Sequence, residues 1–332
     1  MRAKSSIAQN HPKTVIAILG LGQIGASMGL ALAGHASAVQ RIGCDVQPAV
    51  ANRARQIGAI DALKPNAAAA VPDADLVVLA LPFDQIRAVL ESIAPRLKPG
   101  AVVVDTAPAK ETVAAWARQL LPDGRYHVGL APVLTPEALQ SYELGIEAAH
   151  TDLFRSTTLW IVAPIDAPAR AVDMACALAR WLGAEHVFGD AAEVDGLMAL
   201  THLLPQLSAA ALLQSTANRP GWHDAGRLAG RAYAQATHPI EASEPAALAG
   251  ALLANPQNVE RNLNNLIAGL QTLRNLVREN RAEALIETLA QAQQGHLDWW
   301  QRRSINSNDT PAAEIPAASD FWKQILGGRL KK

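Results

Sequence analysis

The sequence predicts an α/β domain with a mostly parallel sheet, followed by an all-helical domain. Strand and helix signals alternate as far as Pro164, only helical signals follow between Ala169 and Trp300, and a glycine-rich turn joins the first strand to the first helix. Alternating strands and helices form parallel sheets that bind ligands beyond the strands' carboxyl ends. The predicted boundaries are 1–13 for a flexible N-terminus, 14–166 for the sheet domain, 167–302 for the helical domain and 303–332 for a linker and terminal tail.

The first strand, 15–19, is short, apolar and rich in β-branched residues, as expected of a buried parallel strand. In the turn after it, Gly20 permits a tight bend, Gly22 the close approach of phosphates, and Gly25 close packing of helix on strand. Residues 26–33 are small and favour a helix. Such a turn directs backbone N–H groups and a helix N-terminus toward a diphosphate, which predicts a dinucleotide site.

The second strand signal, 42–44, ends in Asp45. A carboxylate at this place accepts the hydroxyls of an adenosine ribose and repels a 2′-phosphate, which favours NAD over NADP. Arg53 and Arg55 follow, so NADP stays open. The alternative is a glycine-rich turn that binds no dinucleotide, and the strand before it and the helix after it argue against that alternative.

Four further apolar strands follow, at 75–81, 101–105, 126–130 and 159–163, with helices predicted at 83–93 and 109–121 between them. Because parallel strands share one carboxyl edge, the residues at these strand ends should lie near Asp45. The predicted cofactor-binding residues are Gly20, Leu21, Gly22, Gln23, Ile24, Gly25, Asp45, Leu81, Pro82 and Asp105.

After a helix predicted at 169–182, a long apolar helix is predicted from Ala191 to Gln214. It carries Asp195, His202 and Gln206 at spacings that place them on one face. Pro205 removes one backbone hydrogen bond and should kink the helix. A polar stripe on a kinked apolar helix suggests the wall of a pocket, whereas a core histidine satisfied by local hydrogen bonds is the alternative.

Asn255 and Pro256 predict an N-cap followed by proline at the first helical position. Apolar residues then recur in a heptad-like seam, which suits packing either within one subunit or between two. The polar stretch 304–319 predicts a linker, and 320–326 a short terminal helix. The seam consists of Val259, Leu263, Leu266, Leu270, Leu273 and Val277.

Composition narrows the class of protein. The chain has 332 residues and a net charge of −1, which gives no long-range field for nucleic acid. Cys44 and Cys176 lie in apolar runs and are expected to be buried in a reducing compartment, and no Cys/His cluster predicts a metal site. The first 13 residues lack a signal core, and no stretch approaches the roughly 20 apolar residues that span a bilayer. The sequence therefore predicts a soluble, cytoplasmic protein.

Two further polar residues are candidates for the site. Lys110 follows a strand end and either meets a substrate carboxylate or the cofactor, or is a solvated first-turn lysine. His238 precedes a proline and is expected in a non-helical joint, where a substrate role is the less favoured interpretation. His127 lies inside a strand and is expected to be structural.

Segments spread from Thr14 to Gln294 resemble the prephenate/arogenate dehydrogenase family of tyrosine biosynthesis. The resemblance implies a Rossmann-type N-terminal domain, a helical C-terminal domain that dimerises, and an active site between them. The matching segments are 20–27, Asp45, 74–82, Asp105 with Lys110, Leu153 and Phe154, 181–184, and Asp195 with Ala199, Leu204 and Pro205.

In this family a hydride leaves the hydroxyl-bearing ring carbon of the substrate for the nicotinamide. A histidine accepts a hydrogen bond or proton from that hydroxyl, a serine orients it, and loss of carbon dioxide makes the ring aromatic. Basic and polar residues of the helical domain hold the carboxylates. The resemblance thus implies a small-molecule substrate, NAD as the cofactor and a homodimer.

The chain departs from this pattern where the chemistry takes place. Pro108 stands where the family has the serine, Ala131 where it has the histidine, and His238 where a substrate-binding arginine is usual. His202 lies one residue from a second family histidine and is predicted to take over as the base. The predicted catalytic residues are therefore His202 and Lys110, and the predicted substrate-binding residues are Gln206 and His238.

Three functions remain open from the sequence. The first is oxidative decarboxylation of prephenate or arogenate, as the resemblance implies. The second is a related dehydrogenase that acts on a different small hydroxy acid. The third is a dinucleotide-binding protein without catalysis. The loss of the expected histidine and serine favours the second and the third. The polar stripe favours the first two, because a simple NAD sensor needs no substrate pocket.

Overall fold

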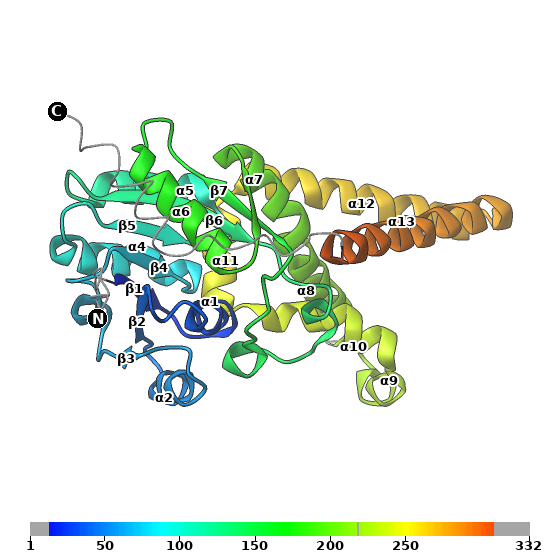
Figure 1. Ribbon diagram of the computed structural model, residues 1–332. Coiled ribbons are helices and arrows are strands. Elements are labelled where there is room, and N and C mark those ends of the chain that lie inside the picture. Colours follow the sequence, from blue (N-terminus) through cyan, green and yellow to red (C-terminus); the bar gives the residue numbers. More distant parts are fainter. Residues whose placement is uncertain (1–12, 218, 309–332) are drawn as a thin grey trace, which may run out of the picture.

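A computed structural model describes residues 13–217 and 219–308 (Figure 1). In this part of the chain, eight strands form one sheet in the order β3-β2-β1-β4-β5-β6-β7-β8. Neighbouring strands are parallel except β6 and β7, which are antiparallel. The strands are β1 (Thr14–Leu19), β2 (Val39–Cys44), β3 (Ala62–Leu63), β4 (Leu76–Leu79), β5 (Val102–Asp105), β6 (Tyr126–Pro132), β7 (Thr158–Val162) and β8 (Glu185–Phe188).

Strand β1 pairs with β2 on one side and with β4 on the other, so the chain reverses its direction across the sheet there. Such a switch point opens a crevice at the carboxyl ends of the strands. Helices cover both faces of the sheet, and each face has its own buried apolar cluster. The first face carries α1 (Gln23–Ala33), α2 (Pro48–Gln56) and α6 (Ala169–Trp181), and the second α3 (Ala67–Ala70), α4 (Phe83–Ile93) and α5 (Lys110–Leu120).

The sheet extends further along the chain than the sequence predicted. Strand β8 pairs in parallel with β7, and α6 packs on the sheet, so the helix-only prediction from Ala169 and the boundary at 166 are wrong. The sheet domain reaches Phe188. All four residues of β8 are exposed, and the strand begins with Glu185 and His186, so it carries none of the apolar pattern that marks a buried strand.

The helical region begins with one continuous helix built from three parts. These are α7 (Ala191–Met198), a π turn (Ala199–Leu203) and α8 (Leu204–Thr216). The irregular turn lies just before Pro205, which lacks the N–H that a regular helix would need there. The helix is thus irregular just before Pro205, the residue at which the sequence predicted a kink. The remaining short elements are α9 (Trp222–Leu228), α10 (Arg231–Thr237), a 3-10 turn (His238–Ala242) and α11 (Pro245–Ala254).

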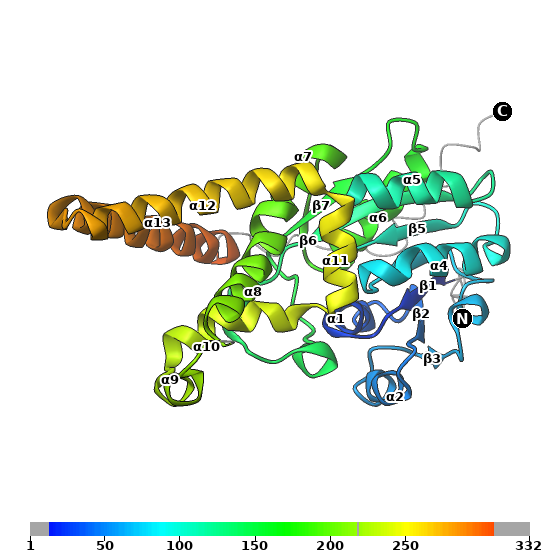
Figure 2. The ribbon, with the colours of Figure 1, turned by 180° about the vertical axis from the view of Figure 1, so that it is seen from behind.

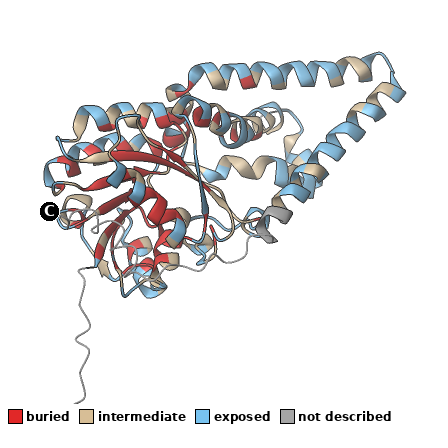
Figure 3. Ribbon diagram, turned by 45° about the horizontal axis from the view of Figure 1, so that its top comes forward, coloured by how far each residue is buried: buried red, intermediate tan, exposed pale blue. Residues whose placement is uncertain are grey.

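Two long helices, α12 (Pro256–Arg278) and α13 (Ala282–Asn308), form a hairpin that projects from the body (Figures 1 and 2). Much of its surface is exposed (Figure 3). In the heptad-like seam, Leu270 is 58% and Val277 65% exposed, so the seam is not closed within this subunit. Helix α13 continues to Asn308, so the predicted start of a linker at Ser304 is wrong. Residues 1–12, the rest of the linker and the helix predicted at 320–326 lie outside the described residues.

One helix among the described residues, Ala191–Thr216, is long and apolar enough to cross a membrane by length and composition alone. The statement that no stretch approaches that length is therefore wrong. This helix is also bonded to the sheet domain, because the carboxylate of Asp195 accepts hydrogen bonds from the start of α5. Cys44 and Cys176 are free and buried, as predicted.

Candidate functional site

In the glycine-rich turn between β1 and α1, two glycines are required by the fold and a third leaves room for a ligand. Gly20 has a φ of +88°, and a Cβ there would lie 2.2 Å from the carbonyl oxygen of Ala80. A Cβ on Gly25 would lie 1.9 Å from the carbonyl oxygen of Gly20. A Cβ on Gly22, in contrast, would meet nothing within 4 Å. The turn therefore keeps open space at the N-terminus of α1, which fits a diphosphate.

Asp45 stands directly after β2 and is bonded to this turn. Its Oδ2 accepts a hydrogen bond from the N–H of Leu21 at 2.8 Å, and its Oδ1 accepts one from the N–H of Gln47 at 2.8 Å. A carboxylate has about four acceptor positions, so both oxygens can still accept ribose hydroxyls. The geometry therefore fits the ribose-binding role predicted for Asp45.

The structure shows a carboxylate partner for Arg53, one of the two arginines that left NADP open. Both guanidinium nitrogens Nε and Nη2 of Arg53 lie 3.2 Å from the carboxylate of Glu147. Glu147 belongs to the loop between β6 and β7, which also accepts a hydrogen bond from Gln23 at the backbone oxygen of Ala148. A guanidinium paired with a carboxylate is less available to a 2′-phosphate, which further favours NAD.

The other predicted cofactor residues occupy the same edge of the sheet with different exposure. Ile24 is partly buried in the first turn of α1. Leu81 and Pro82 form the connection between β4 and α4, and Pro82 is exposed there. Asp105, at the end of β5, is fully buried.

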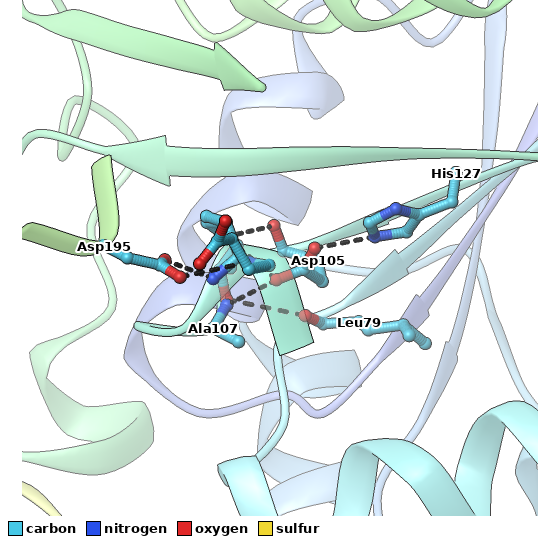
Figure 4. A network of polar contacts seen from close by, with 8 residues as sticks. Leu79, Asp105, Ala107, His127 and Asp195 are labelled. Atoms are coloured by element: carbon cyan, nitrogen blue, oxygen red, sulfur yellow. Dashed lines mark hydrogen bonds and ion pairs between the residues drawn. The ribbon is translucent and has the colours of Figure 1, made fainter. Parts of the chain in front are cut away.

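Asp105 lies at the centre of a buried polar network (Figure 4). Its Oδ1 lies 2.8 Å from Nζ of Lys110 and accepts the N–H of Ala107 at 2.9 Å, and its Oδ2 lies 2.8 Å from Nε2 of His127. The side chains of Asp105 and Lys110 are both 0% exposed. Burial alone would raise the pKa of Asp105, but Lys110 and His127 lower it to about 2.

This burial changes the roles predicted for the pair. Nζ of Lys110 has a second partner, the backbone oxygen of Asp105 at 3.2 Å, and burial lowers the pKa of the lysine against the attraction of Asp105. Neither side chain reaches solvent. The interpretation of Lys110 as a solvated first-turn lysine is therefore wrong. The burial of Lys110 and Asp105 also argues against direct contact of either side chain with a ligand. The structural role predicted for His127 agrees with the geometry.

Asp195 joins the two domains. Its carboxylate accepts hydrogen bonds from the N–H groups of Lys110 and, at 3.1 Å, Glu111, so it caps α5 from a different element. Burial raises its pKa, and the capping bonds oppose that rise. Nδ2 of Asn255 donates to the backbone oxygen of Asp195 at 2.7 Å. The predicted side-chain cap by Asn255 is absent, because that side chain binds α7 instead.

The predicted polar stripe does not share one environment. Asp195 and Gln206 are each 2% exposed, whereas His202 is exposed to solvent. The π turn between them adds a residue to one turn and so rotates the later positions. Leu203, next to His202, packs in the buried cluster that contains Ala107 and Ala109 beyond β5. The π turn that carries His202 packs against α8, α11 and α12.

The imidazole of His202 is accessible to water and at the same time surrounded by protein atoms. Its desolvation lowers the pKa below the ordinary 6.5, which favours the neutral form. Nε2 of the Gln206 side chain donates to the backbone oxygen of His202 at 3.0 Å, and Oε1 has no partner among the described residues. Gln206 is therefore placed to hold the turn that carries His202, and its burial argues against direct contact with a ligand.

Ala131 and His238 are two further departures noted in the sequence. Ala131 is 7% exposed and packs against Val162 and Val194, so an apolar cluster closes this position. His238 is partly buried, with Nδ1 3.5 Å from the carboxylate of Glu241 and its ring 4.8 Å from that of Tyr142. The loop between β6 and β7 thus reaches both α1 and His238, a contact that no local sequence signal revealed.

Among the described residues, no group of three or more His, Cys, Asp or Glu side chains could hold a metal ion. The candidate site combines an open glycine turn and the carboxylate of Asp45, both at the carboxyl edge of the sheet, with His202, whose lowered pKa favours the neutral form. Such an arrangement can bind a dinucleotide and accept a proton from a substrate hydroxyl.

Two family models match the chain. The prephenate dehydrogenase nucleotide-binding domain matches residues 28–188, and the prephenate dehydrogenase dimerization domain matches residues 190–291. Their junction agrees with the end of β8. The chain is 26% identical to the prephenate dehydrogenase of Bacillus subtilis over 278 residues, covering 83% of this chain and 73% of that protein. It is 26% identical to the cyclohexadienyl dehydrogenase of Zymomonas mobilis over 285 residues, covering 85% and 94%.

Solved structures show the same fold. Prephenate dehydrogenase from A. aeolicus, in complex with hydroxyphenyl propionate and NAD+, has a TM-score of 0.75 and 19% identity, covering 87% of this chain and 99% of that one. Arogenate dehydrogenase from Synechocystis has a TM-score of 0.65 and 22% identity, covering 86% and 100%. The matched nucleotide-binding domain and the relative with bound NAD+ support NAD as the cofactor. By its two domains and its fold, the chain belongs to the prephenate dehydrogenase family.

Proposed function

We propose that the chain is an NAD-dependent dehydrogenase that oxidatively decarboxylates prephenate or arogenate in tyrosine biosynthesis. The observation that carries this proposal is the open space above Gly22 beside the carboxylate of Asp45, at the edge of the sheet of a prephenate dehydrogenase family member. Relatives named prephenate, cyclohexadienyl and arogenate dehydrogenase support the substrate class.

NAD, when bound, accepts the hydride that leaves the hydroxyl-bearing ring carbon. The hydroxyl proton needs an acceptor while that carbon becomes a carbonyl. The ring carboxylate then departs as carbon dioxide and leaves its electron pair in the ring, and a proton returns to the ring oxygen. His202 is our candidate for the acceptor, because its lowered pKa keeps the imidazole neutral near pH 7 and its side chain is accessible.

The other predicted site residues take supporting roles in this proposal. Lys110 and Asp105 hold the end of β5, beside which a ligand would lie, and Gln206 holds the turn that carries His202. His238 is proposed to contact the substrate from the helical domain, where it faces Tyr142 of the loop after β6. No metal takes part in the proposal.

We further propose a homodimer formed through the helical domain, in the cytoplasm. The match to a dimerization domain supports the dimer, as do the exposed apolar side chains on the projecting hairpin, among them Leu270, Val277, Leu289 and Leu297. A second copy that covers this seam would remove apolar surface from water.

A second candidate function is a dinucleotide-binding protein without turnover. The apolar packing around Ala131 favours it, because no base stands at the position where the resemblance implies one. A dehydrogenase for another small hydroxy acid is the third possibility. Both predict NAD binding without reduction of NAD by prephenate or arogenate.

The test combines wild-type protein with NAD and either substrate and follows the absorbance of the reduced cofactor. We expect reduction by wild-type protein and a loss of about 10²–10⁴-fold in His202→Ala, which removes the proton acceptor. NAD affinity should be equal in the two proteins. Because the neutral imidazole is the active form, turnover should decline as the pH falls through a value below 6.5. An unchanged rate in His202→Ala would contradict the role of His202.

A further inference from the structure

The end of α13 returns to the carboxyl edge of the sheet. Nη2 of Arg303 donates a hydrogen bond to the backbone oxygen of Leu134 at 2.9 Å. Leu134 follows β6 by two residues, and the β4–β6 side of a sheet with this strand order receives the nicotinamide half of a dinucleotide. The match to the dimerization domain ends at residue 291, so this arginine lies beyond the matched region.

Arg303 lines an open cavity of about 360 Å³ on one side of α13, and the other lining residues, Gly295, Asp298, Trp299 and Arg302, belong to the same helix. The lining thus contains two guanidinium groups and one carboxylate. That carboxylate, on Asp298, already accepts a hydrogen bond from Gln294 at 2.7 Å. The ring of Trp299 is 49% exposed and offers an apolar surface beside these charges.

The guanidinium of Arg303 is partly desolvated, and the described side chains offer it no compensating charge. Burial lowers its pKa, and no carboxylate pairs with it among the side chains described in residues 13–303. A partly buried cation without an anion is unfavourable, and a bound anion relieves that cost. An arginine has five N–H donors, so the bond to Leu134 leaves donors for a bidentate contact.

Two basic side chains predicted for the site, Lys110 and His238, already lie close to carboxylates of the protein. Lys110 is fully buried and paired with Asp105. His238 stands where the resemblance implies an arginine, and it lies close to the carboxylate of Glu241. Arg303, in contrast, contacts the segment after β6, lines a cavity and has no carboxylate partner among the described side chains.

We propose that the cavity beside Trp299 binds a carboxylate of the cyclic substrate through Arg303, in place of the arginine that the chain lacks at His238. This inference rests on the proposed function and adds a residue that determines its specificity. The carboxylate accepts N–H groups from the guanidinium, while the ring of the ligand lies against the indole.

The test compares wild-type protein with Arg303→Gln, Arg303→Lys and Arg274→Gln in NAD reduction by prephenate and arogenate. We expect KM to rise about 10-fold or more in Arg303→Gln, with a smaller change in kcat, and Arg303→Lys to recover part of the loss. Arg274→Gln removes the same charge from an exposed position near the tip of the hairpin and should leave KM unchanged. Equal NAD affinity in all four proteins shows that the fold is retained.

A calorimetric titration with hydroxyphenyl propionate separates this inference from the proposed function. Wild-type protein should bind this carboxylate, and Arg303→Gln should bind it at least 10-fold more weakly. If the wild type reduces no NAD but the titration still shows this difference, the proposed function fails and the carboxylate site stands. An unchanged KM in an active Arg303→Gln variant, equal titrations, or no binding to the wild type would overturn the site.

Discussion

At the end of β5, the carboxylate of Asp105 holds Lys110 and His127 in a network that water does not reach. A lysine next to a ligand-binding edge suggests a ligand contact when the sequence is considered alone. The structure instead shows a side chain that joins the start of α5 to the end of β5. Its spacing from Asp105 is visible in the sequence, but the contribution of His127 from the neighbouring strand is not, because strand register depends on the assembled sheet.

Loss of one member of this buried network should lower the stability of the fold. Lys110→Met leaves Asp105 buried without its cation and should lower the free energy of unfolding by about 3–5 kcal/mol at pH 7. Because the pKa of Asp105 is about 2 in the fold against an ordinary 3.8, the ion pair stabilises the fold above pH 3.8 and this contribution is lost as the pH falls through about 2. Urea unfolding at several pH values measures it.

The matched control replaces both partners. Asp105→Leu combined with Lys110→Met removes the buried carboxylate as well, and should cost less than the sum of the two single changes. Equal stability of Lys110→Met and wild-type protein at pH 7 would contradict the account of this network.

At the scale of elements, substitutions in the turn between β1 and α1 should separate effects on protein stability from effects on NAD binding. Gly22→Ala should change the free energy of unfolding by no more than about 1 kcal/mol, because its Cβ meets nothing within 4 Å. It should weaken NAD binding at least 10-fold, because that Cβ enters the space for the diphosphate. Calorimetric titration with NAD gives the affinity, and thermal unfolding gives the stability.

Gly25→Ala is the contrasting variant. Its Cβ would lie 1.9 Å from the carbonyl oxygen of Gly20, so the protein itself should be destabilised. Equal NAD affinity in Gly22→Ala and wild-type protein would show that the diphosphate does not lie above Gly22.

The elements predicted correctly from the sequence are those whose burial produces a recognisable local pattern of apolar residues. Strands β1, β4 and β5 are buried on both faces and therefore form continuous apolar runs. Strand β8 escaped prediction because it is short, polar at its start and exposed. Helix α6 was predicted as a helix but assigned to the wrong domain, since an apolar face packs equally well on a sheet or on other helices.

The site residues could likewise be predicted where a local sequence pattern determines their geometry, and not where distant segments determine it. The glycines and Asp45 could be predicted because one local turn contains their geometry. The environments of His202 and Gln206 could not, because a π turn rotates them away from the face of a regular helix. The contacts of Arg303 with Leu134 and of His238 with Tyr142 join segments that are far apart in the sequence.

At the scale of the whole molecule, the projecting hairpin carries apolar side chains that this subunit does not bury. We expect Leu270→Lys to weaken the homodimer at least 10-fold, because it places a charge in the apolar seam. Ile165→Lys makes the same change at a fully exposed site between β7 and α6 and should leave the dimer intact. Sedimentation equilibrium of the two variants measures the association, and a Leu270→Lys dimer as stable as the wild type would place the interface elsewhere.

We propose that this molecule couples hydride transfer to decarboxylation at the edge of its sheet. The direct measurement counts carbon dioxide released and NAD reduced in one reaction of wild-type protein with prephenate, and in another with arogenate. With at least one of these substrates, we expect equal amounts of both products. Binding of NAD with neither product formed from either substrate, or reduction of NAD without release of carbon dioxide, would contradict it.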